Sequence, residues 1–337
     1  MARRSPLKRG LVRRELSLAE IFQIGYYWET KILLTAVRLD VFSILGEKER
    51  TLPEVAAQIG ADPRALELLL NALVAMKVLT KEGIRFANTN TARTHLVKSR
   101  PNYIGHLLLL HDAEWNNWGK LDETIKTGRS PVSQHVFETN PELGANVLSV
   151  LDRIGQQSGP GLAKRLGLDG AKTLLDLGGG AGTNAIAFCA VYPQMRAVVF
   201  DLPQTLQVAE RAIKEAGLEG RISLQPGNFN ADPLGGPYDA ILMSDILHYQ
   251  GPEANEALVR KAFSHLSAGS KLIIKDRFLE ESRTGPAWVT AFAVHILVNT
   301  ERGRCYTAAE AAGWMERAGF ASVVELERTA VVQGTKS

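Results

Sequence analysis

Apolar residues are spaced in two different ways along this chain. Between residues 15 and 165 they recur at steps of three and four, the spacing of amphipathic helices. From about residue 171 they form short runs separated by helical segments. Strands that alternate with helices are typical of a parallel sheet with helices on both faces. We therefore expect an α/β fold with a Rossmann-like doubly wound sheet, preceded by a mostly α-helical domain.

Local signals mark the elements of the helical half. Capping boxes at Ser17–Glu20 and Thr51–Glu54 each place a hydroxyl and a carboxylate where they satisfy free amides at a helix start. Asp62 followed by Pro63 marks another helix start, and a small hairpin is expected to turn at Glu82–Gly83. Helix, turn, helix and hairpin in this order form a winged-helix pattern.

A winged helix can bind DNA, but the composition of its second helix argues against that function. This helix is dominated by Leu, Ala and Val, and Arg64 and Lys77 are its only basic residues. A helix that reads base edges presents several Arg, Lys, Asn or Gln side chains. We expect no nucleic-acid partner.

Five candidate strands and two terminal strands follow in the second half. They are KTLLDLG, RAVVFDLP, RISLQPGNF, YDAILMSDIL and SKLIIKDRF, then SVVELER and TAVVQGTK. Ligands in such folds bind at the carboxyl ends of the parallel strands. Residues that end or follow these runs are therefore the first candidates for a functional site.

Composition limits the class and the location of the protein. The 337 residues are enough for two domains, and we expect a basic arm at 1–17, a helical domain at 18–165 and the sheet domain at 166–337. No apolar run reaches the roughly 18 residues that a membrane span needs. Cys189 and Cys305 are the only cysteines, too few for a disulfide framework or a metal cluster. These features predict a cytoplasmic protein without a metal.

Positive charge is concentrated at the N-terminus. The first 14 residues, MARRSPLKRGLVRR, contain six basic residues and no acid, which leaves 33 of the 39 basic residues against 36 acidic ones. Such an arm can bind nucleic acid or acidic lipid, or stay solvated. No apolar segment follows it as in a secretory signal. We interpret it as a flexible arm that is solvated or docks a partner.

The most informative stretch is TLLDLGGGAGTNAIAF, in which an apolar run ends in an acid and glycines precede a helix. A phosphate-binding P-loop needs a Lys after the glycines, and none is present. A dinucleotide fingerprint that starts at Gly178 needs Gly or Ala where Thr183 stands. The stretch does fit Asp-x-Gly-x-Gly-x-Gly, with Asp176, Gly178, Gly180 and Gly182.

This spacing fits S-adenosylmethionine. Glycines let the backbone approach a ligand closely, and the amides that open the next helix can bind the methionyl carboxylate. Asp176 is placed to meet the ammonium group or a bridging water, and Asp201, 25 residues later, to chelate the ribose diol. Gly227, Asn228 and Phe229 follow the third strand and are expected to flank the adenine. The alternative is a tight turn that holds no ligand.

With these motifs the chain resembles a known family. LLDLGGGAGTNA, VVFDLP, GNF, ILMSDILHYQ and AGSKLIIKDRFLEE stand in the order of the plant caffeate-type and bacterial acetylserotonin or hydroxyindole-type O-methyltransferases. The tail LVNTERGRCYTAAEAAGWMERAGF is similar to that of the bacterial members. The resemblance begins near residue 18 and implies a class I methyltransferase that depends on S-adenosylmethionine. It also implies an intertwined homodimer, in which the N-terminal winged-helix domain mediates dimerisation and helps close the partner's pocket.

The resemblance places the general base in a motif similar to LHDW, which is LHYQ here and carries over to His248. A neutral imidazole is a sensible base for a phenol, whose pKa is about 10. Two Glu residues flank the base in plant members. The first corresponds to Asp276, and the second to Cys305, a thiol that cannot replace a carboxylate. Tyr249 also departs from the motif, and the alternative for His248 is a structural role.

The resemblance also extends the expected cofactor site. The Asp of a GDFF-like motif corresponds to Asn228, whose amide oxygen can still accept a hydrogen bond from the adenine amine. Leu202 is expected to pack on the adenine. Ser244 and Asp245 stand where other members place residues close to the cofactor.

Two helical stripes are candidates for the acceptor pocket. They are His111, Trp115 and Trp118 on one predicted helix, and Phe292, His295 and Asn299 before the GRCYT turn that holds Cys305. The second stripe corresponds roughly to substrate-contacting positions in the family. Aromatic residues at this spacing also occur in ordinary cores, and that alternative stays open. His111 and His295 are the alternative bases if His248 is structural.

The sequence thus favours an O-methyltransferase that acts on a small hydroxylated aromatic or a related secondary metabolite. Methyl transfer to sulfur or carbon on the same scaffold is an alternative, because it relies more on orientation than on a base. A non-catalytic regulator that uses the winged helix and the basic arm is a third interpretation. It would bind nucleic acid in a salt-dependent way.

Overall fold

The computed structural model describes residues 15–133 and 136–337. The chain divides into two compact units, one ending at Pro101 and one beginning at Asn102. This division lies before the boundary expected at residue 165, because the helix Pro141–Leu166 (α11) packs on helices of the second unit. Residues 1–14 of the expected basic arm lie outside the described residues.

The first unit combines helices with a small antiparallel sheet of order β1-β3-β2. Its elements are α1 (Leu18–Gly25), α2 (Trp28–Arg38), α3 (Val41–Leu45), β1 (Arg50–Thr51), α4 (Leu52–Ile59), α5 (Pro63–Ala75), β2 (Leu79–Glu82), β3 (Arg85–Asn88) and α6 (Asn90–His95). The predicted capping boxes at Ser17–Glu20 and Thr51–Glu54 are present. The Asp62 carboxylate accepts a hydrogen bond from the Ala65 amide, and the predicted hairpin is confirmed as β2 and β3.

One buried side chain joins the sheet of this unit to its helices. Asn88, the last residue of β3, is 2 % exposed. Its amide nitrogen donates hydrogen bonds of 2.8 Å to the Phe42 carbonyl and 2.9 Å to the Gly46 carbonyl. Asn88 therefore satisfies carbonyl groups at the C-terminal end of α3 from a neighbouring strand.

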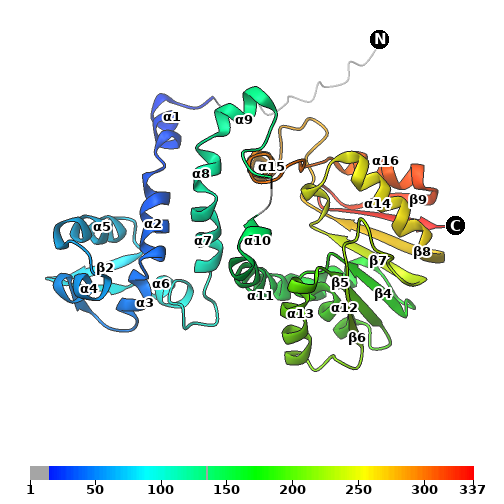
Figure 1. Cartoon of the computed structure of the whole chain (residues 1–337), viewed down its shortest axis with the longest axis horizontal. Helices are drawn as coiled ribbons and strands as arrows, with labels where there is room; N and C mark the ends of the chain where they lie inside the picture. The colour runs from blue at the N-terminus through cyan, green and yellow to red at the C-terminus, as the bar shows by residue number, and fades with distance from the viewer. Residues whose placement is uncertain (1–14, 134–135) are drawn as a thin grey trace, which may run out of the picture. The chain divides into compact units, whose positions relative to one another are not determined.

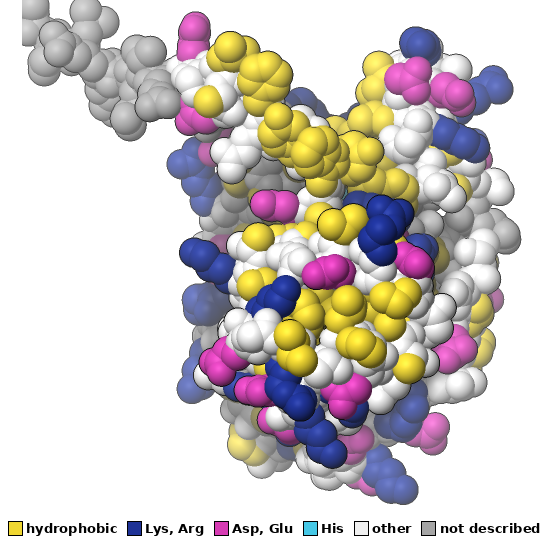
Figure 2. All heavy atoms as spheres, turned by 90° about the vertical axis from the view of Figure 1, so that its left-hand side faces the viewer, with side chains coloured by type: hydrophobic (Ala, Val, Ile, Leu, Met, Phe, Trp, Pro, Cys, Tyr) yellow, Lys and Arg dark blue, Asp and Glu magenta, His cyan; other side chains and the backbone are white. Residues whose placement is uncertain are grey.

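The start of the first unit carries a large apolar surface. We call it the α1 apolar surface; its members, each more than half exposed, are Leu16, Leu18, Ile21, Phe22, Ile24, Tyr26, Tyr27 and Trp28. No residue of α1 is buried. Hydrophobic side chains gather in the upper part of Figure 2, over this helix. A contiguous patch of this kind marks a surface that another molecule covers.

The second unit begins with a run of helices and continues as alternating strands and helices. Its elements are α7 (Gly105–Ala113), α8 (Trp115–Trp118), α9 (Leu121–Thr127), α10 (Val136–Thr139), α11, β4 (Thr173–Leu177), α12 (Thr183–Val191), β5 (Arg196–Asp201), α13 (Pro203–Glu215), β6 (Ile222–Pro226), β7 (Tyr238–Ser244), η1 (Leu247–Tyr249), α14 (Pro252–Ser264), β8 (Leu266–Lys275), α15 (Ala287–Asn299), α16 (Ala308–Ala318), β9 (Phe320–Glu327) and β10 (Val331–Lys336). The single helix predicted across His111 and Trp118 is interrupted at Glu114, between α7 and α8.

The strands of this unit form one seven-stranded sheet of order β6-β5-β4-β7-β8-β10-β9. The strands β4 to β8 pair in parallel, whereas β10 is antiparallel to both β8 and β9. The five predicted strands and the two terminal ones are all present, and the predicted α/β fold is confirmed. The chain leaves β4 toward β5 on one side and returns to place β7 on the other. The carboxyl ends of β4 and β7 are therefore the point of reversed strand order at which ligands of this fold bind.

Alternation along the strands builds a core on each face of the sheet. Leu175 and Leu177 of β4 join a cluster with residues of α14 and α16, while Leu174 joins a second cluster with residues of α11, α12 and α13. Figure 1 shows these two sets of helices on opposite faces of the sheet. Both faces of the sheet are therefore buried, and a ligand must bind at the ends of the strands.

Among the described residues, no helix is both long enough and apolar enough to cross a bilayer.

Replacing Asn88 by Leu removes the donor to two carbonyls at the end of α3. We expect the free energy of unfolding to fall by about 2 kcal/mol, because a buried polar group without its partner costs about 1–3 kcal/mol. Chemical denaturation followed by circular dichroism measures this loss. Asn90→Leu is the matched control, since Asn90 is exposed and should change stability by less than about 0.5 kcal/mol. Equal stability of the two variants would contradict the role assigned to Asn88.

Candidate cofactor and acceptor site

The three glycines of the predicted motif all adopt positive φ, at 68° for Gly178, 57° for Gly180 and 77° for Gly182. The loop follows β4, and Gly182 is the N-cap of α12. A Cβ at Gly178 would lie 2.6 Å from the Ile246 side chain, so this loop contacts the segment that follows β7. The first amides of a helix lack partners within the helix and can bind an anionic group, and at the start of α12 the Ala185 amide already bonds the Asp176 carboxylate.

Asp201 links this loop to the end of β5. Its Oδ2 accepts a 2.8 Å hydrogen bond from the Gly180 amide, and its Oδ1 accepts a 2.7 Å bond from the Leu202 amide. Burial raises the pKa of Asp201, and these two amides partly offset the rise. Leu202 is 38 % exposed beside it, so an apolar surface and a carboxylate lie next to each other. That the ribose diol and the adenine bind at this pair stays a prediction from the sequence.

The Asp176 carboxylate is fully buried beneath the loop. Its Oδ2 accepts a 3.1 Å hydrogen bond from the Ala185 amide, and its Oδ1 has no hydrogen-bond partner among the described residues. A Cβ at Gly179 would lie 2.8 Å from the Asp176 Cγ, so the loop covers the carboxyl closely. Burial raises the pKa of Asp176 to about 7. In this geometry Asp176 supports the loop from below, and its contact with a ligand stays a prediction.

The segment after β6 is held by its own turn. Asp232 accepts a hydrogen bond from the Asn228 amide, and the Asn228 side-chain oxygen accepts one from the Asn230 amide. Gly227 has no room for a side chain, because a Cβ there would lie 2.6 Å from the Phe200 ring. Phe229 is half-buried against the first core cluster. The Asn228 oxygen expected to meet the adenine thus already has a partner, although an oxygen can accept a second hydrogen bond.

Ser244 ends β7 and Asp245 follows it, and both contact basic residues at or just beyond the end of β8. The Ser244 hydroxyl donates to Asp245, and Lys275 and Arg277 both pair with the Asp245 carboxylate. Burial would raise the pKa of Asp245, but the two cations hold it below its usual range. Asp245 has a φ of 58°, which orients the chain into the turn that carries His248.

His248 and Asp276 form a buried polar pair in the site. The Nδ1 of His248 lies 2.7 Å from Asp276 Oδ1, and the two residues are 2 % and 6 % exposed. Asp276 also accepts hydrogen bonds from the amides of Leu247, at 3.1 Å, and Arg277, at 2.7 Å. Because a carboxylate can only accept hydrogen bonds, Asp276 favours the imidazole tautomer with the proton on Nδ1. This leaves Nε2 of His248 as the basic nitrogen.

The turn around His248 is supported from several sides. The Asn255 side chain donates a 2.9 Å hydrogen bond to the Leu247 carbonyl, and the Tyr306 hydroxyl donates to the Gln250 carbonyl. A Cβ at Gly303 would lie 2.3 Å from the His248 carbonyl oxygen. The start of the GRCYT turn, at Gly303, therefore passes directly against the backbone of the candidate base.

Cys305 packs in a small apolar cluster with Leu279 and Val289 and is 3 % exposed. Burial raises the pKa of its thiol to about 12, and the Asp276 charge adds to the rise. The thiol is therefore uncharged at neutral pH. It cannot supply the second carboxylate that plant members of the resembling family place at this position.

Phe292 and His295 of α15 form part of an aromatic stripe beside His248. The ring centroid of Phe292 lies 5.2 Å from that of His248 and 5.8 Å from that of His295. Trp288 stacks on Phe292 with centroids 5.1 Å apart, and Arg277 lies over both of these rings. The predicted second stripe is thus brought close to the candidate base. His111 and Trp115 stand at the end of α7 and the start of α8, the first exposed and the second half-buried.

Two buried acids near these elements have no counterpart in the sequence interpretation. Asp152 of α11 accepts hydrogen bonds from Thr183, in the first turn of α12, and from Gln156. Glu114, between α7 and α8, is 2 % exposed and faces His111 and His295. The sequence gives little signal for either acid, because Asp112 stands two residues before Glu114 and Arg153 follows Asp152.

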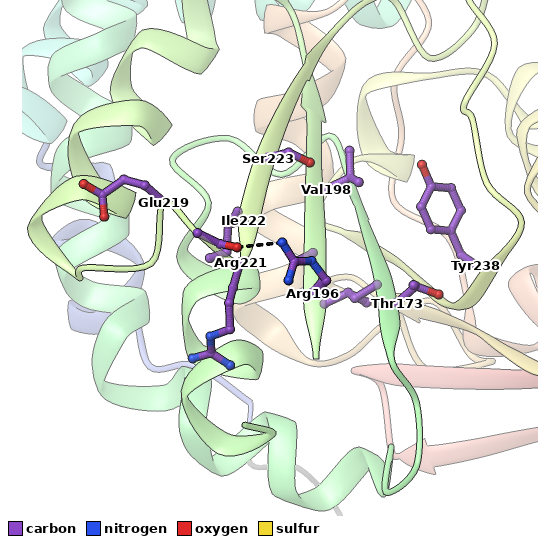
Figure 3. Close-up of a pocket in the computed structure, with 11 residues that line it drawn as sticks. Thr173, Arg196, Val198, Glu219, Arg221, Ile222, Ser223 and Tyr238 are labelled. Atoms are coloured by element: carbon purple, nitrogen blue, oxygen red, sulfur yellow. Dashed lines mark hydrogen bonds between the residues drawn. The ribbon is translucent and has the colours of Figure 1, made fainter. Parts of the chain in front are cut away.

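A cavity of about 220 Å³ lies at the opposite edge of the sheet (Figure 3). It is lined by the first residues of four parallel strands, Thr173, Arg196, Ile222 and Tyr238. The Arg196 guanidinium donates a 2.7 Å hydrogen bond to the Gly220 carbonyl there. Because ligands of this fold bind at the carboxyl ends of the strands, we do not assign this cavity to the functional site.

Within the described ranges, no three His, Cys, Asp or Glu side chains gather as metal ligands would.

Two family models match this chain. The O-methyltransferase domain matches residues 125–321, which is more than half of the chain, and the O-methyltransferase dimerisation domain matches residues 22–98. The tetracenomycin polyketide synthesis 8-O-methyl transferase TcmO of Streptomyces glaucescens is 31 % identical over 91 % of both chains. The acetylserotonin O-methyltransferase of Bos taurus is 30 % identical over 87 % of this chain and 89 % of the relative.

Solved structures share the fold of this chain. An O-methyltransferase family protein from Burkholderia thailandensis superposes with a TM-score of 0.85 at 27 % identity, covering 96 % of this chain and 99 % of the other. Human N-acetylserotonin methyltransferase in complex with SAM has the same fold, with a TM-score of 0.80 at 22 % identity over 96 % and 99 % of the two chains. The chain belongs to the O-methyltransferase family and is an S-adenosylmethionine-dependent methyltransferase with a dimerisation domain.

Proposed function

We propose that this enzyme methylates a hydroxyl group of a small aromatic acceptor, with His248 as the general base. The observation that carries this proposal is the 2.7 Å contact between His248 Nδ1 and the Asp276 carboxylate. It orients the imidazole with Nε2 free to take the acceptor proton, and it stabilises the imidazolium that forms. The neighbouring Phe292 ring supplies an aromatic wall against which an acceptor ring can pack.

The residues around the glycine loop fit the cofactor. Three left-handed glycines bring the backbone close to a ligand, and the first amides of α12 suit its carboxylate. Asp201 and Leu202 suit the ribose and the adenine. When bound, S-adenosylmethionine supplies a methyl group on a positively charged sulfur. The chain's own part is to bind both reactants, align them and remove one proton.

Relatives support an aromatic acceptor but also leave a second possibility. One relative, from Streptomyces sahachiroi, is a 3-hydroxy-5-methyl-1-naphthoate 3-O-methyltransferase and is 30 % identical. Another, from Streptomyces lavendulae, is an L-tyrosine C(3)-methyltransferase and is 28 % identical. Carbon methylation on this scaffold is therefore the second candidate. The uncharged Cys305 favours it, because one orienting carboxylate is missing.

We further propose that two copies associate through the α1 apolar surface. A dimerisation domain matches residues 22–98, and the exposed apolar side chains of α1 would be buried by a second copy.

Both cysteines are buried and unpaired, which suits a reducing compartment such as the cytoplasm.

Incubation with labelled S-adenosylmethionine and a panel of phenols, indoles, quinols and small thiols tests the activity, with adenosylhomocysteine release as the readout. We expect turnover with phenols. Turnover with thiols alone, or methylated product on a ring carbon, would exclude the O-methyl proposal. Salt-dependent binding of nucleic acid without turnover would favour the non-catalytic interpretation.

Replacing His248 by Ala should lower kcat for a phenol by about 100-fold or more, since general-base catalysis contributes 10²–10⁴-fold. Calorimetry should find the affinity for S-adenosylmethionine nearly unchanged. His265→Ala is the matched control, because His265 lies at the end of α14 and bonds the Lys261 carbonyl. Unchanged kcat in the His248 variant would remove this residue from the role of base.

Replacing Asp276 by Asn should lower kcat about 10- to 100-fold while leaving the KM of the acceptor within about threefold, because the imidazole loses its orienting carboxylate. Asp276→Glu should restore much of the rate. Asp239→Asn is the control: its carboxylate also accepts backbone amides, of Lys172 and Thr173, but at the opposite strand ends. Equal losses of kcat in the Asp276 and Asp239 variants would mean that Asp276 only maintains the fold.

The double replacement Ile21→Asp and Phe22→Asp should convert the dimer to a monomer at micromolar concentration, because it places charge in the proposed apolar interface. Light scattering after size exclusion measures the mass. Ile84→Asp is the control, since Ile84 is 74 % exposed in the hairpin turn and outside this surface. A double variant that keeps the mass of the wild type would contradict an interface at α1.

A further inference from the structure

Glu114 is a buried carboxylate that the proposed chemistry does not use. It is 2 % exposed, and neither of its oxygens accepts a hydrogen bond from the side chains or backbone of the described residues. The Nε2 of His295 lies 3.7 Å from Glu114 Oε2, and the Nδ1 of His111 lies 3.9 Å from the same oxygen. Both histidines thus face Oε2, and no such contact is made with Oε1. A buried carboxylate oxygen without a partner is costly and calls for a donor.

A chain of hydrogen bonds fixes the orientation of His295 toward this acid. The Asn117 amide nitrogen donates a 2.8 Å hydrogen bond to Asn299 Oδ1, and Asn299 Nδ2 lies 3.2 Å from His295 Nδ1. Because Asn299 Nδ2 can only donate, His295 Nδ1 accepts and the ring proton sits on Nε2. That N–H faces Glu114. Burial lowers the pKa of His295, although the nearby Glu114 opposes this shift, so the ring stays neutral. The contact with Asn299 then determines which ring nitrogen carries the proton.

This pair stands at one end of a row of rings that leads to the candidate base. His295 stacks on Phe292 with an interplanar angle of 22°, and Phe292 stacks on Trp288 at 9°. His248 meets the Phe292 ring at 81°, with centroids 5.2 Å apart. Trp118 is a further ring near His295, with ring centroids 6.2 Å apart. The row thus places His248 on one side of Phe292 and His295, with the Glu114 that it faces, on the other.

We propose that Glu114 selects the acceptor: its Oε1 accepts a hydrogen bond from a second O–H or N–H group, which the acceptor carries on a ring away from the hydroxyl that is methylated at His248. The acceptor is then a planar aromatic of at least two fused rings with two donor groups. This inference rests on the proposed function for the position of the reacting hydroxyl. Glu114 touches the acceptor but takes no proton from the reacting oxygen, so it determines specificity.

The proposal predicts strong discrimination against acceptors that lack the second donor. Such an acceptor leaves the buried carboxylate unpaired, and a hydrogen bond to a charged group is worth about 1.5–3 kcal/mol. That energy corresponds to a preference of about 10- to 100-fold in binding. A site built around a substrate donor rejects the analogue without it for the same reason.

The test compares the binding of 2-naphthol with that of 1,6- and 2,7-dihydroxynaphthalene, in which the two hydroxyls stand on different rings. Calorimetry is done on the full-length enzyme loaded with adenosylhomocysteine. We expect at least one of the diols to bind about 10- to 100-fold more tightly than 2-naphthol. Glu114→Leu should reduce this ratio to about one by weakening the diol only, and Glu114→Gln should keep part of it. 7-Amino-2-naphthol shows whether an N–H donor serves as well as a hydroxyl.

Glu123→Leu is the matched control, since Glu123 is exposed on α9 close by in the sequence. A diol preference that survives Glu114→Leu, or its absence in the wild type, would overturn the inference, as would failure of every naphthalene to bind. Turnover measured in parallel separates the two proposals. A Glu114-dependent preference without methylated product contradicts the proposed function alone. Methylation with equal efficiency for the mono-hydroxyl and diol acceptors contradicts the role of Glu114 alone.

Discussion

The Asp276 carboxylate joins three parts of the molecule at one point. It accepts hydrogen bonds from the imidazole of His248, from the amide that opens the 3₁₀ turn at Leu247, and from the amide of Arg277 beyond β8. A buried carboxylate needs such donors, and these come from two neighbouring parallel strands whose carboxyl ends the sheet places side by side. The register of β7 and β8 thus determines where the candidate base stands, and the rest of the site is arranged around that position.

Several further carboxylates lie at the carboxyl ends of the parallel strands, each in a different environment. Asp201 is held by two loop amides, Asp176 is enclosed beneath the glycine loop, and Asp245 is balanced by Lys275 and Arg277. Only the last is paired with cations. The others rely on backbone amides, which present partial positive charge without adding flexible side chains. This arrangement suits the proposed cofactor, because amides at a helix start can meet its carboxylate while the acids can meet its positive charge.

The sequence predicts those features that depend on neighbours along the chain. The glycine spacing, the capping boxes and the strand ends are local, so the left-handed glycines and the positions of Asp201 and His248 follow from the order of the residues. Glu114 could not be predicted in this way, because its environment is created by His295, about 180 residues later. The sequence also did not predict the division of the chain after Pro101. The helix α11 has a helical pattern like that of the first unit, and only its packing shows that it belongs to the second.

Gly303 shows that positions around the imidazole differ in how freely they can be substituted. Any side chain at this position would collide with the His248 carbonyl, so the segment that passes the base has a single permitted course. The residues of α15 are under no such backbone constraint, because Phe292 and His295 meet their surroundings through side chains that are partly exposed. A lineage can exchange those rings one at a time and keep the base where it is. We then expect acceptor range to diversify on a helix, while the proposed base stays in a turn whose backbone leaves little room for change.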